Sequence, residues 1–425
     1  MTDKPLTKNI RPGAEPLSLK EYEQAGGYQS IRKALRDLAP ERVVEMVKRA
    51  NLQGRGGAGF PTGVKWGFMP PADHERRPRY LVVNADEMEP GTFKDRLLME
   101  GDPHLVVEGI LASAYAVRAD VAYLFLRRSY EPASARLERA IAEAYAAGYL
   151  GKNILGSPWS LELYLHTSAG RYMCGEETAT LSALEGRRAV PRAKPPHPVI
   201  CGLWGKPTTV DNVETLACVP GIVNFGPEWF LGLSRTGDGG TKLYAASGKV
   251  RRPGIWELPM GATAREVLEE HAGGMREGLA CRAVLPGGAS TPFLVPEHFD
   301  VPMDFTGLPK VGSRLGTGTL IVLDDKTCPV AMLHNLEVFF ARESCGWCTP
   351  CRDGLPWTRD TLLAIEEGRG AAEDLDVLRD HTEWLGPGRT FCALAPGAME
   401  PLASGLRHFR DDFERHIREQ RCPWG

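Results

Sequence analysis

No cysteine occurs before Cys174 in this chain of 425 residues. Secreted proteins held together by disulfides are short and spread their cysteines along the chain, so this distribution argues against that class. The sequence also lacks an apolar run long enough to span a bilayer, because charged residues interrupt the best candidate, Leu105 to Leu126. Its first residues lack the apolar stretch of a secretory signal. We therefore expect a cytosolic protein that reaches a membrane through partners, without direct insertion.

The chain has no excess of positive charge. Its net charge is −3 and its pI is near 6.4, whereas a nucleic-acid binder would normally be basic, so we expect no nucleic-acid partner. Apolar residues make up 43% and charged residues 25%, which is typical of a globular protein. A chain of this length is too long for one compact core, so several domains are expected.

The order of predicted elements indicates an α/β multidomain protein. We predict a helical extension over residues 1–50, an α/β layer domain over 51–235, a small α+β domain over 240–325 and a helical bundle over 330–425. The α/β domain is predicted from three short apolar runs, 80–83, 121–126 and 161–166, with helices over 103–117 and 132–147 between them. The small domain has four predicted strands around one helix, 264–269.

Two further expectations concern connections and the last helix. A proline-rich stretch, AVPRAKPPHPVICGLWGKPTTVDN, ends at Asn212 and is predicted to be an ordered surface loop. Near the end of the chain, apolar residues recur at steps of three and four from Leu402 to Ile417. This spacing predicts one continuous helix over 396–418 with a single apolar face, the last of four helices in the bundle.

Four cysteines in the last hundred residues have the spacing of a metal site. ESCGWCTPC places Cys345, Cys348 and Cys351 two residues apart, and TFCALAP adds Cys392. Thiolates are soft ligands that suit iron–sulfur clusters or zinc. Structural zinc usually takes two separated C-x2-C pairs, whereas three cysteines two apart are typical of a 4Fe–4S cluster. The spacing therefore favours a 4Fe–4S cluster, with zinc or buried thiols as alternatives. Five other cysteines lie singly, and most of them are interpreted as buried thiols: Cys201, Cys218, Cys281, Cys328 and Cys422.

A glycine-rich segment, GRGGAG, satisfies the G-x-G-x-x-G pattern with Gly54, Gly56 and Gly59. A dinucleotide-binding turn of this kind follows a strand, but residues 42–53 are predicted to be helical, and Asp73 at the distance of a ribose ligand does not end a strand. The glycines would still expose backbone N–H groups, and Arg55 and Lys65 would add positive charge suited to phosphate. The loop is either a plain turn or an unusual nucleotide or flavin site.

Two acidic segments follow predicted strands. NADEMEPGTFKD carries Asp86, Glu87 and Glu89 after the run 80–83, and AGRYMCGEETA carries Glu176 and Glu177 after the run 161–166. Charge runs are usually solvated surface. However, loops at the carboxyl ends of strands are also where α/β sheets bind ligands, so these carboxylates are candidates for accepting hydrogen bonds from ribose or ribityl hydroxyls.

Six motifs occur in a fixed order: GRGGAGFPTGVKW, NADEMEPGTFKDR, AGRYMCGEETA, KPTTVDNVETL, ESCGWCTPCRDG and TFCALAPGA. Together they resemble the NADH-binding flavoprotein subunit of bacterial respiratory complex I, the 51-kDa subunit of mitochondria. The resemblance implies a non-Rossmann FMN-binding α/β domain, a ubiquitin-like β-grasp domain and a C-terminal four-helix bundle that carries the 4Fe–4S cluster. These agree with the three regions predicted above.

The resemblance also implies which residues bind the cofactors. Those implied for FMN lie in four motifs: Gly54, Arg55, Gly56, Gly57, Gly59, Lys65, Asn84, Asp86, Glu87, Gly175, Glu176, Glu177, Val210, Asp211, Asn212 and Thr215. Those implied for NAD(H) are Phe60, Phe68, Glu89, Glu177 and Lys194, and Tyr172 is predicted to contact a cofactor that is not specified further. The family's cluster ligands match Cys345, Cys348, Cys351 and Cys392. No catalytic acid or base is nominated, because the cofactors carry the hydride chemistry.

The chain departs from the family pattern at two positions. Where the family usually has KPPFP this chain has KPPHP, so His197 replaces a phenylalanine that would stack on adenine. The family's Asn-Asn is here Asp211-Asn212, and a carboxylate near a flavin phosphate would be unfavourable. Asp211 is therefore expected to point away from the phosphate or to use only its backbone.

The resemblance implies a function and a set of partners. The expected reaction is hydride transfer from NADH to FMN followed by transfer of single electrons to the cluster. The expected partners are a thioredoxin-like 2Fe–2S subunit and a large multi-cluster subunit, with the assembly on the cytoplasmic side of the inner membrane. Two alternatives stay open: a diaphorase subunit of an NAD-linked hydrogenase or formate dehydrogenase, and a non-catalytic scaffold with structural zinc.

Overall fold

The computed structural model describes residues 3–71 and 77–424, so Asp73 lies outside the described residues. The chain forms two compact units, each of which is built from three separate segments. The first unit comprises Met1–Met88, Phe93–Leu243 and Glu257–Gly261, and the second comprises Glu89–Thr92, Tyr244–Trp256 and Ala262–Gly425. Within 3–71 and 77–424, no helix combines the length and the hydrophobicity that crossing a bilayer requires.

A parallel four-stranded sheet forms the centre of the first unit. Its strands are β1 (Tyr80–Ala85), β2 (Val121–Leu126), β3 (Glu162–Thr167) and β4 (Thr208–Asn212), in the order β3-β2-β1-β4. The first three match the predicted runs. The prediction of a surface loop up to Asn212 was wrong at β4, which pairs with β1 so that Val210 lies opposite Val82. Short and rich in Thr, Asp and Asn, β4 lacks a strand-like apolar pattern, and its burial comes from tertiary pairing.

Twelve helices are labelled in this unit over the described residues. They are α1 (Leu19–Gln24), α2 (Gln29–Asp37), α3 (Pro40–Arg49), α4 (Thr62–Gly67), α5 (Lys94–Gly101), α6 (Pro103–Ala116), α7 (Glu131–Ala146), α8 (Glu177–Leu184), α9 (Pro198–Cys201), α10 (Val213–Ala217), α11 (Val219–Phe225) and α12 (Pro227–Gly232). The helical extension and the two helices predicted between strands are present. Buried α6 begins where Asp102 caps it, accepting a bond from the Leu105 amide at 3.3 Å.

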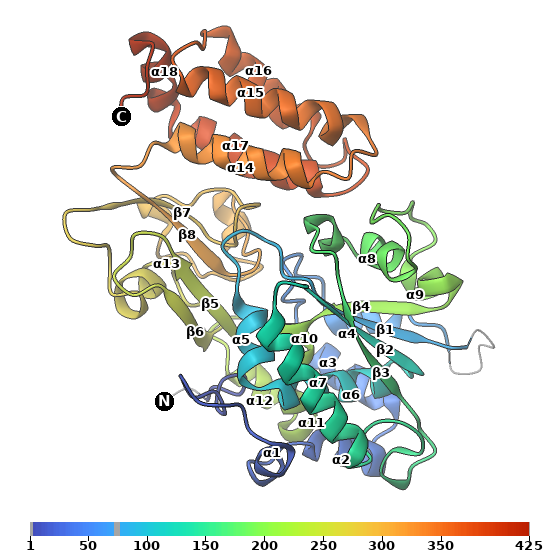
Figure 1. Cartoon of the computed structure of the whole chain (residues 1–425). Helices are drawn as coiled ribbons and strands as arrows, with labels where there is room; N and C mark the ends of the chain where they lie inside the picture. The colour runs from blue at the N-terminus through green and yellow to red at the C-terminus, as the bar shows by residue number, and fades with distance from the viewer. Residues whose placement is uncertain (1–2, 72–76, 425) are drawn as a thin grey trace. The chain divides into compact units, whose positions relative to one another are not determined.

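The order of the strands places helices on both faces of the sheet. The chain runs from β1 through β2 to β3 in one direction and then returns to add β4 on the other side of β1. Because such connections are right-handed, α6 and α7 lie on one face and α8 on the other, as Figure 1 shows. One face packs Val82 and Phe125 against Leu181 of α8. The reversal between β1 and β4 is a topological switch point, where α/β sheets bind ligands.

The start and the end of the first unit are joined through Glu257. Its carboxylate accepts hydrogen bonds from the backbone amides of Leu6 (3.1 Å) and Thr7 (2.8 Å) and from the hydroxyl of Thr241 (2.6 Å). Glu257 is almost fully buried, so these donors replace the water that a carboxylate would otherwise bind. The short segment Glu257–Gly261 is therefore part of the first unit although it lies far along the chain.

The second unit contains a bundle of helices and most of a mixed sheet, of which strands β5 and β6 each have a few residues in the first unit. The strands are β5 (Thr241–Ser247), β6 (Gly254–Pro259), β7 (Cys281–Leu285) and β8 (Thr319–Asp324), in the order β6-β5-β8-β7. Strands β5 and β8 are parallel, and β7 is antiparallel to β8. One helical segment, α13 (Ala264–Glu266) continued by Val267–His271, lies between β6 and β7, where one helix was predicted. The four strands match those expected of the small α+β domain.

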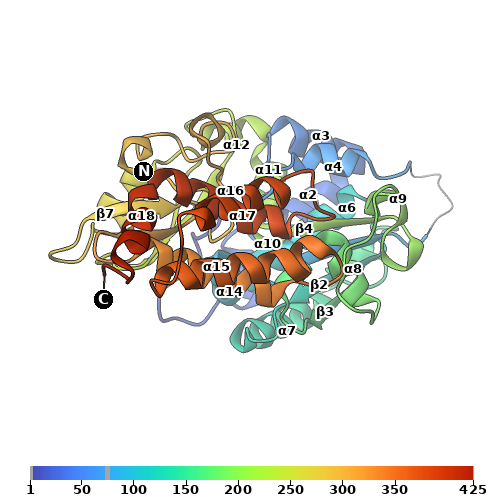
Figure 2. The ribbon, with the colours of Figure 1, turned by 90° about the horizontal axis from the view of Figure 1, so that it is seen from above.

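Five helices form the bundle, one more than predicted. They are α14 (Pro329–Glu343), α15 (Leu355–Glu366), α16 (Glu373–Trp384), α17 (Leu394–His408) and α18 (Arg410–Glu419). Figure 2 shows α14 beside α15 and α16 beside α17. The prediction of one continuous last helix was wrong, because the backbone leaves the helical region at Phe409 (φ −123°, ψ 24°). The Phe409 ring packs on Phe293, so the apolar spacing continues across the break and hides it.

Candidate cofactor sites

The glycine-rich loop is a tight hairpin between α3 and α4. The Gly54 amide donates to the Phe60 carbonyl at 3.0 Å, and Gln53 forms a β-bridge with Pro61. Within it, Gly57 (φ +120°) and Gly59 (φ +69°) have left-handed backbone angles that side chains disfavour. The loop thus follows a helix, as predicted, and it is not a Rossmann turn.

This loop contacts the end of β4 and the start of α10. The Arg55 amide donates to the Thr215 hydroxyl at 2.8 Å. A Cβ added to Gly56 would lie 3.2 Å from the Asn212 Cβ, which is tighter than ordinary contact, so the absence of a side chain permits this close approach. The structure therefore brings together the predicted residues of the glycine loop and of the TTVDNVET motif.

The end of β1 contacts the turn before α8. The Asn84 amide donates to the Cys174 carbonyl at 2.7 Å, and its oxygen accepts the Asp86 N–H at 3.0 Å. The Asp86 carboxylate accepts the Ser168 hydroxyl at 2.9 Å. A Cβ added to Gly175 would meet no atom within 4 Å, so space is open in front of this glycine. The half-buried Tyr172 opens the same turn, Tyr172–Gly175.

Two acidic residues that were predicted to bind ligand cap helices. Glu87 is buried and accepts the Asp95 and Arg96 amides at the start of α5, at 2.9 and 3.2 Å, and the Tyr130 hydroxyl at 3.1 Å. Burial, and then the Asp95 carboxylate, raise the pKa of Glu87 to about 7. Glu176 caps α8 by accepting the Ala179 amide at 2.8 Å. These carboxylates orient the helices that begin at the carboxyl edge of the sheet.

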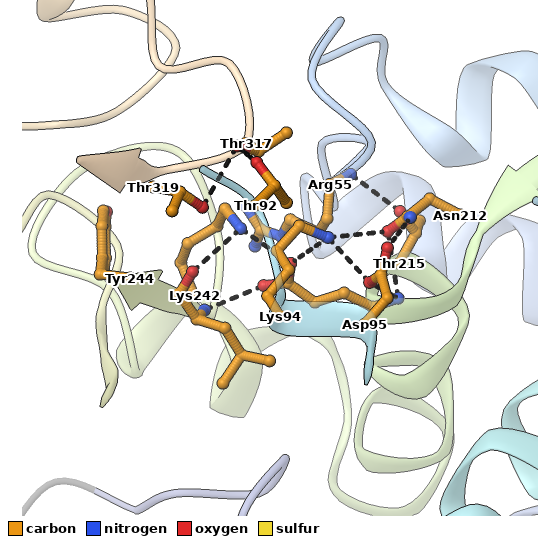
Figure 3. Close-up of polar contacts among 12 residues, drawn as sticks. Arg55, Thr92, Lys94, Asp95, Asn212, Thr215, Lys242, Tyr244, Thr317 and Thr319 are labelled. Carbon is orange, nitrogen blue, oxygen red and sulfur yellow. Dashed lines mark hydrogen bonds and ion pairs between the residues drawn. The ribbon is translucent and has the colours of Figure 1, made fainter. Parts of the chain in front are cut away.

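A buried charge network that sequence reasoning missed supports Asn212 and Thr215, as Figure 3 shows. Lys94 lies 2.8 Å from carboxylate oxygens of both Asp95 and Glu214, and Lys242 lies 2.7 Å from Glu214. The Asn212 amide donates to Asp95 at 2.7 Å. The charged residues stand in NADEMEPGTFKDR and VET, but the first motif was interpreted as a source of ligand-binding carboxylates, and no pairing of Lys94 with Glu214 was predicted.

The protonation of this network follows from its burial. Burial opposes ionisation of Glu214, but the ammonium groups of Lys242 and Lys94 overcome it and lower the Glu214 pKa to about 2. Burial also lowers the pKa of Lys242 to about 8, against the opposing effect of Glu214. Side chains that are paired in this way hold a fixed arrangement, because removing one partner leaves an uncompensated buried charge.

Two basic residues predicted to face a phosphate have protein partners. Lys65 lies 2.6 Å from the Asp211 carboxylate and also donates to the Val210 carbonyl, and the other Asp211 oxygen accepts the Trp66 indole N–H at 2.8 Å. Asp211 is thus buried and paired within the protein, and its orientation relative to a flavin phosphate stays a prediction. The Arg55 guanidinium is fully buried and donates to the carbonyls of Gly239 (2.7 Å) and Thr241 (3.3 Å). Its partners are carbonyl oxygens, so it stabilises the loop.

The predicted nucleotide contacts are distributed over both units. Phe60 and Phe68 are 49% and 55% exposed, with ring centroids 6.5 Å apart, so both present aromatic surface to solvent. Lys194 lies 2.6 Å from Glu177 and 3.1 Å from Glu176, and His197 is exposed before α9. Glu89 belongs to the second unit, where it accepts the Ser290 amide at 2.7 Å. The roles of these side chains toward NADH stay predictions.

The four predicted cluster ligands lie together in the helical bundle. Cys345 and Cys348 lie between α14 and α15, Cys351 lies in the helical turn Pro350–Gly354 that leads into α15, and Cys392 precedes α17. Burial raises the pKa of Cys351 to about 12, with further contributions from the thiols of Cys392, Cys348 and Cys345. Neighbouring thiols that disfavour one another's ionisation become stable thiolates when metal cations lie between them, so the donor set fits an iron–sulfur cluster.

The loop that carries Cys392 lines a hollow, and an aromatic pair lies beside it. A cavity of about 360 Å³ is lined by residues that include Arg314, Phe391, Cys392 and Glu400. Trp347 and Phe391 pack edge to face with centroids 4.5 Å apart, and both are exposed. Gly346 (φ +70°) allows the sharp turn after Cys345.

Comparison with known proteins identifies relatives along the chain. The Nuo51 FMN-binding domain matches residues 47–221, the SLBB domain 245–294, and the NADH-ubiquinone oxidoreductase-F iron-sulfur binding region 331–416. The chain is 56% identical to the F subunit of NADH-quinone oxidoreductase in Salmonella typhimurium and to that in Escherichia coli, over 98% of this chain and 93% of each relative. Among solved structures, it resembles the NAD+-reducing NiFe-hydrogenase in the air-oxidized state, with a TM-score of 0.82, 35% identity, and coverage of 95% of this chain and 67% of that one.

Proposed function

The chain belongs to the family of the F subunit of NADH-quinone oxidoreductase, the FMN-binding 51K subunit of complex I, and on this premise we propose which residues perform its reaction. The family's reaction is oxidation of NADH through FMN, with electrons passed on through a 4Fe–4S cluster. When bound, FMN supplies hydride acceptance and release of single electrons, and the cluster supplies one-electron transfer. The protein supplies binding, orientation and electrostatics.

FMN is assigned to the carboxyl edge of the first unit's sheet, at the switch point between β1 and β4. One observation supports this most: the glycine loop, the end of β1 and the end of β4 converge there, with Gly56 against Asn212 and Asn84 bonded to the Cys174 carbonyl. Loop amides would donate to the flavin, and the network of Lys94, Asp95 and Glu214 keeps Asn212 and Thr215 in place.

NADH is assigned to the exposed side chains beside this edge. Phe60 and Phe68 offer aromatic faces, which would stack against the dinucleotide, and the Lys194–Glu177 pair offers one positive and one negative group to its polar parts. The binding side chains orient the nicotinamide and exclude water. No acid or base of the protein takes part in the hydride step.

Cys345, Cys348, Cys351 and Cys392 are assigned as the cluster ligands. Their thiols lie near one another, and the loops that carry them are fixed by α14, α15 and α17. The four predicted regions, 1–50, 51–235, 240–325 and 330–425, then serve as an extension, the FMN and NADH domain, a β-grasp domain and the cluster domain. The exposed Trp347 and Phe391 beside the cysteines are suited to contact with a protein partner that receives electrons.

The partners follow from membership of complex I. The chain should assemble with a thioredoxin-like 2Fe–2S subunit and a large multi-cluster iron–sulfur subunit, on the cytoplasmic side of the inner membrane. The likeness to NAD+-reducing hydrogenase supports a second candidate, the diaphorase subunit of such an enzyme. Purifying the native complex and identifying its other chains separates the two: quinone-dependent oxidation of NADH supports the first, and oxidation of hydrogen supports the second.

The FMN assignment is tested by Gly56→Val with Gly67→Val as its matched control. A side chain at Gly56 would press on Asn212, whereas one at Gly67 would meet no atom within 4 Å. We expect Gly56→Val to lose FMN on desalting while it keeps its iron, and Gly67→Val to keep both. FMN at one per chain in Gly56→Val would contradict the assignment.

A further inference from the structure

Four potential metal ligands that the proposed function does not use converge at one end of the helical bundle. Cys328, Glu366, His416 and Cys422 each direct one ligand atom to a common point, and these atoms all lie within 4.8 Å of one another. In the sequence they are widely separated, and Cys328 and Cys422 look like isolated thiols. The group belongs entirely to the second unit.

Each ligand comes from a different part of the bundle. Cys328 precedes α14, Glu366 is the last residue of α15, His416 lies in α18, and Cys422 follows α18. A shared ion would therefore tie the final segment of the chain to the start of α14 and the end of α15. Cys345–Cys351 lie at the other end of these two helices, as Figure 1 shows, so the two groups of cysteines are distinct.

The distances within the group fit a tetrahedral ion. The Cys328 Sγ lies 3.1 Å from Glu366 Oε2 and 3.3 Å from His416 Nε2, and these last two atoms are 3.1 Å apart. Ligands of a tetrahedral zinc ion, at bond lengths of about 2.0–2.3 Å, lie about 3.3–3.8 Å from each other. Movements of a few tenths of an ångström convert one arrangement into the other.

The surroundings fix the histidine in the orientation that a ligand needs. His416 Nδ1 lies 2.7 Å from the Asp412 carbonyl oxygen, which can only accept, so Nδ1 carries the proton and Nε2 faces the group. This is the usual second contact of a histidine bound to metal. His416 is fully buried, and the Trp424 ring stacks on it at 5.8 Å with an interplanar angle of 16°. The imidazole is thus held between its own helix and the end of the chain.

We propose that Cys328, Glu366, His416 and Cys422 bind one structural zinc ion. Two sulfurs and one imidazole nitrogen select a borderline or soft cation over Mg²⁺ or Ca²⁺, which take oxygen ligands. Four protein ligands leave no open position, so the ion is structural and does not take part in catalysis. Binding releases the thiol protons and leaves two thiolates, one carboxylate and a neutral imidazole around the ion.

Metal content of the full chain tests the proposal. Protein purified without oxygen and passed through metal-free buffer should hold about one zinc per chain in addition to its iron. In Cys422→Ser and in His416→Gln, the zinc content per chain should fall at least about fivefold, whereas FMN and iron should be retained. Cys201→Ser is the matched control, because this cysteine is exposed and belongs to neither group; its zinc should be unchanged.

A second measurement guards against loss through misfolding. In Cys348→Ala, which should lack the colour of the cluster, added Co²⁺ should produce a sulfur-to-cobalt charge-transfer band, and adding Cys422→Ser should lower the cobalt bound by about one per chain while the circular dichroism is unchanged. Zinc well below one per chain in the parent protein after incubation with zinc sulfate would overturn the proposal. So would equal zinc in the ligand variants, or a Cys328–Cys422 disulfide in the anaerobic protein.

Discussion

The pair of helices α14 and α15 has cysteines beside both of its ends, and the two ends are built differently. At the loop end, three cysteines lie within seven residues and the local chain path brings them together. At the other end, Cys328 meets Glu366, His416 and Cys422 only because three helices pack. The ends are separated by the length of α14, about 22 Å for its 15 residues. A pattern within one loop can be found in the sequence, whereas a convergence of distant residues requires the fold.

The largest effect is expected from Cys348→Ala at the loop end. Loss of one of four thiolates should abolish the cluster, so iron and its EPR signal should disappear. FMN should stay bound, and oxidation of NADH by ferricyanide should largely survive, because that acceptor can take electrons before the cluster. The zinc content should be unaffected, which would show that the two ends bind their metals independently. A full-strength cluster signal in this variant would sink the assignment of Cys348.

Cys328→Ser tests whether the sulfur at the other end binds zinc or only caps α14. The Cys328 sulfur also caps α14, accepting the Ala331 amide at 3.4 Å. Serine is a better cap than cysteine but a poor ligand for zinc, so zinc should be lost, while the metal-free variant and the metal-free parent should unfold within about 0.5 kcal/mol of each other. Metal analysis and chemical unfolding of the same sample measure both. Retained zinc would show that the sulfur acts as a cap alone.

A third prediction concerns Glu337, which lies along α14 between the two ends. It is fully buried, and neither carboxylate oxygen has a hydrogen-bond partner among the residues the structure describes. Burial raises its pKa well above the ordinary value, so the folded chain holds it protonated. Glu337→Met should stabilise the bundle by ~1–3 kcal/mol, the usual penalty of a buried unpaired polar group.

The gain in Glu337→Met should depend on pH. Above about pH 4.3 the unfolded chain ionises this group while the folded chain keeps its proton, so stability falls as pH rises, by up to about 1.4 kcal/mol per pH unit, until the folded pKa is reached. The difference in unfolding midpoint between Glu337→Met and the parent should therefore be larger at about pH 8 than at about pH 6, both of which lie above the ordinary glutamate pKa. Glu383→Met, at an exposed position of α16, is the control and should show no such divergence.

The smallest effect is expected at the aromatic edge of the loop end. Trp347 packs on Phe391 beside the cluster cysteines and is 53% exposed. Trp347→Ala should let solvent reach the cluster more easily, so iron loss in air should speed up several-fold without a change in the iron content of anaerobic protein. The exposed Trp384 is the control. Equal rates for Trp347→Ala and the parent would remove any shielding role.

Local pattern predicted much of the fold and part of the candidate site. Strand β2 occurs at the predicted bounds, and the four clustered cysteines lie together. Where the prediction failed, tertiary contacts decide the outcome: β4 is a strand because β1 pairs with it, and the helix breaks at Phe409 while the apolar spacing continues. The roles of Lys94 and Lys242 were missed for the same reason, since only burial against Glu214 distinguishes them from surface charges.

The contact of Glu257 with Leu6 and Thr7 can form only late in synthesis, because its two sides are far apart in the sequence. Leu6 and Thr7 are made long before their acceptor, which follows about 250 positions later, at a sequence separation of 251 residues for Leu6. At about 5–20 residues per second, roughly 13–50 s pass before Glu257 is made. Until then the backbone amides of Leu6 and Thr7 lack the Glu257 carboxylate as their acceptor, so the first unit cannot finish folding during synthesis. Chaperones that hold exposed segments therefore have a defined interval in which to act on this chain.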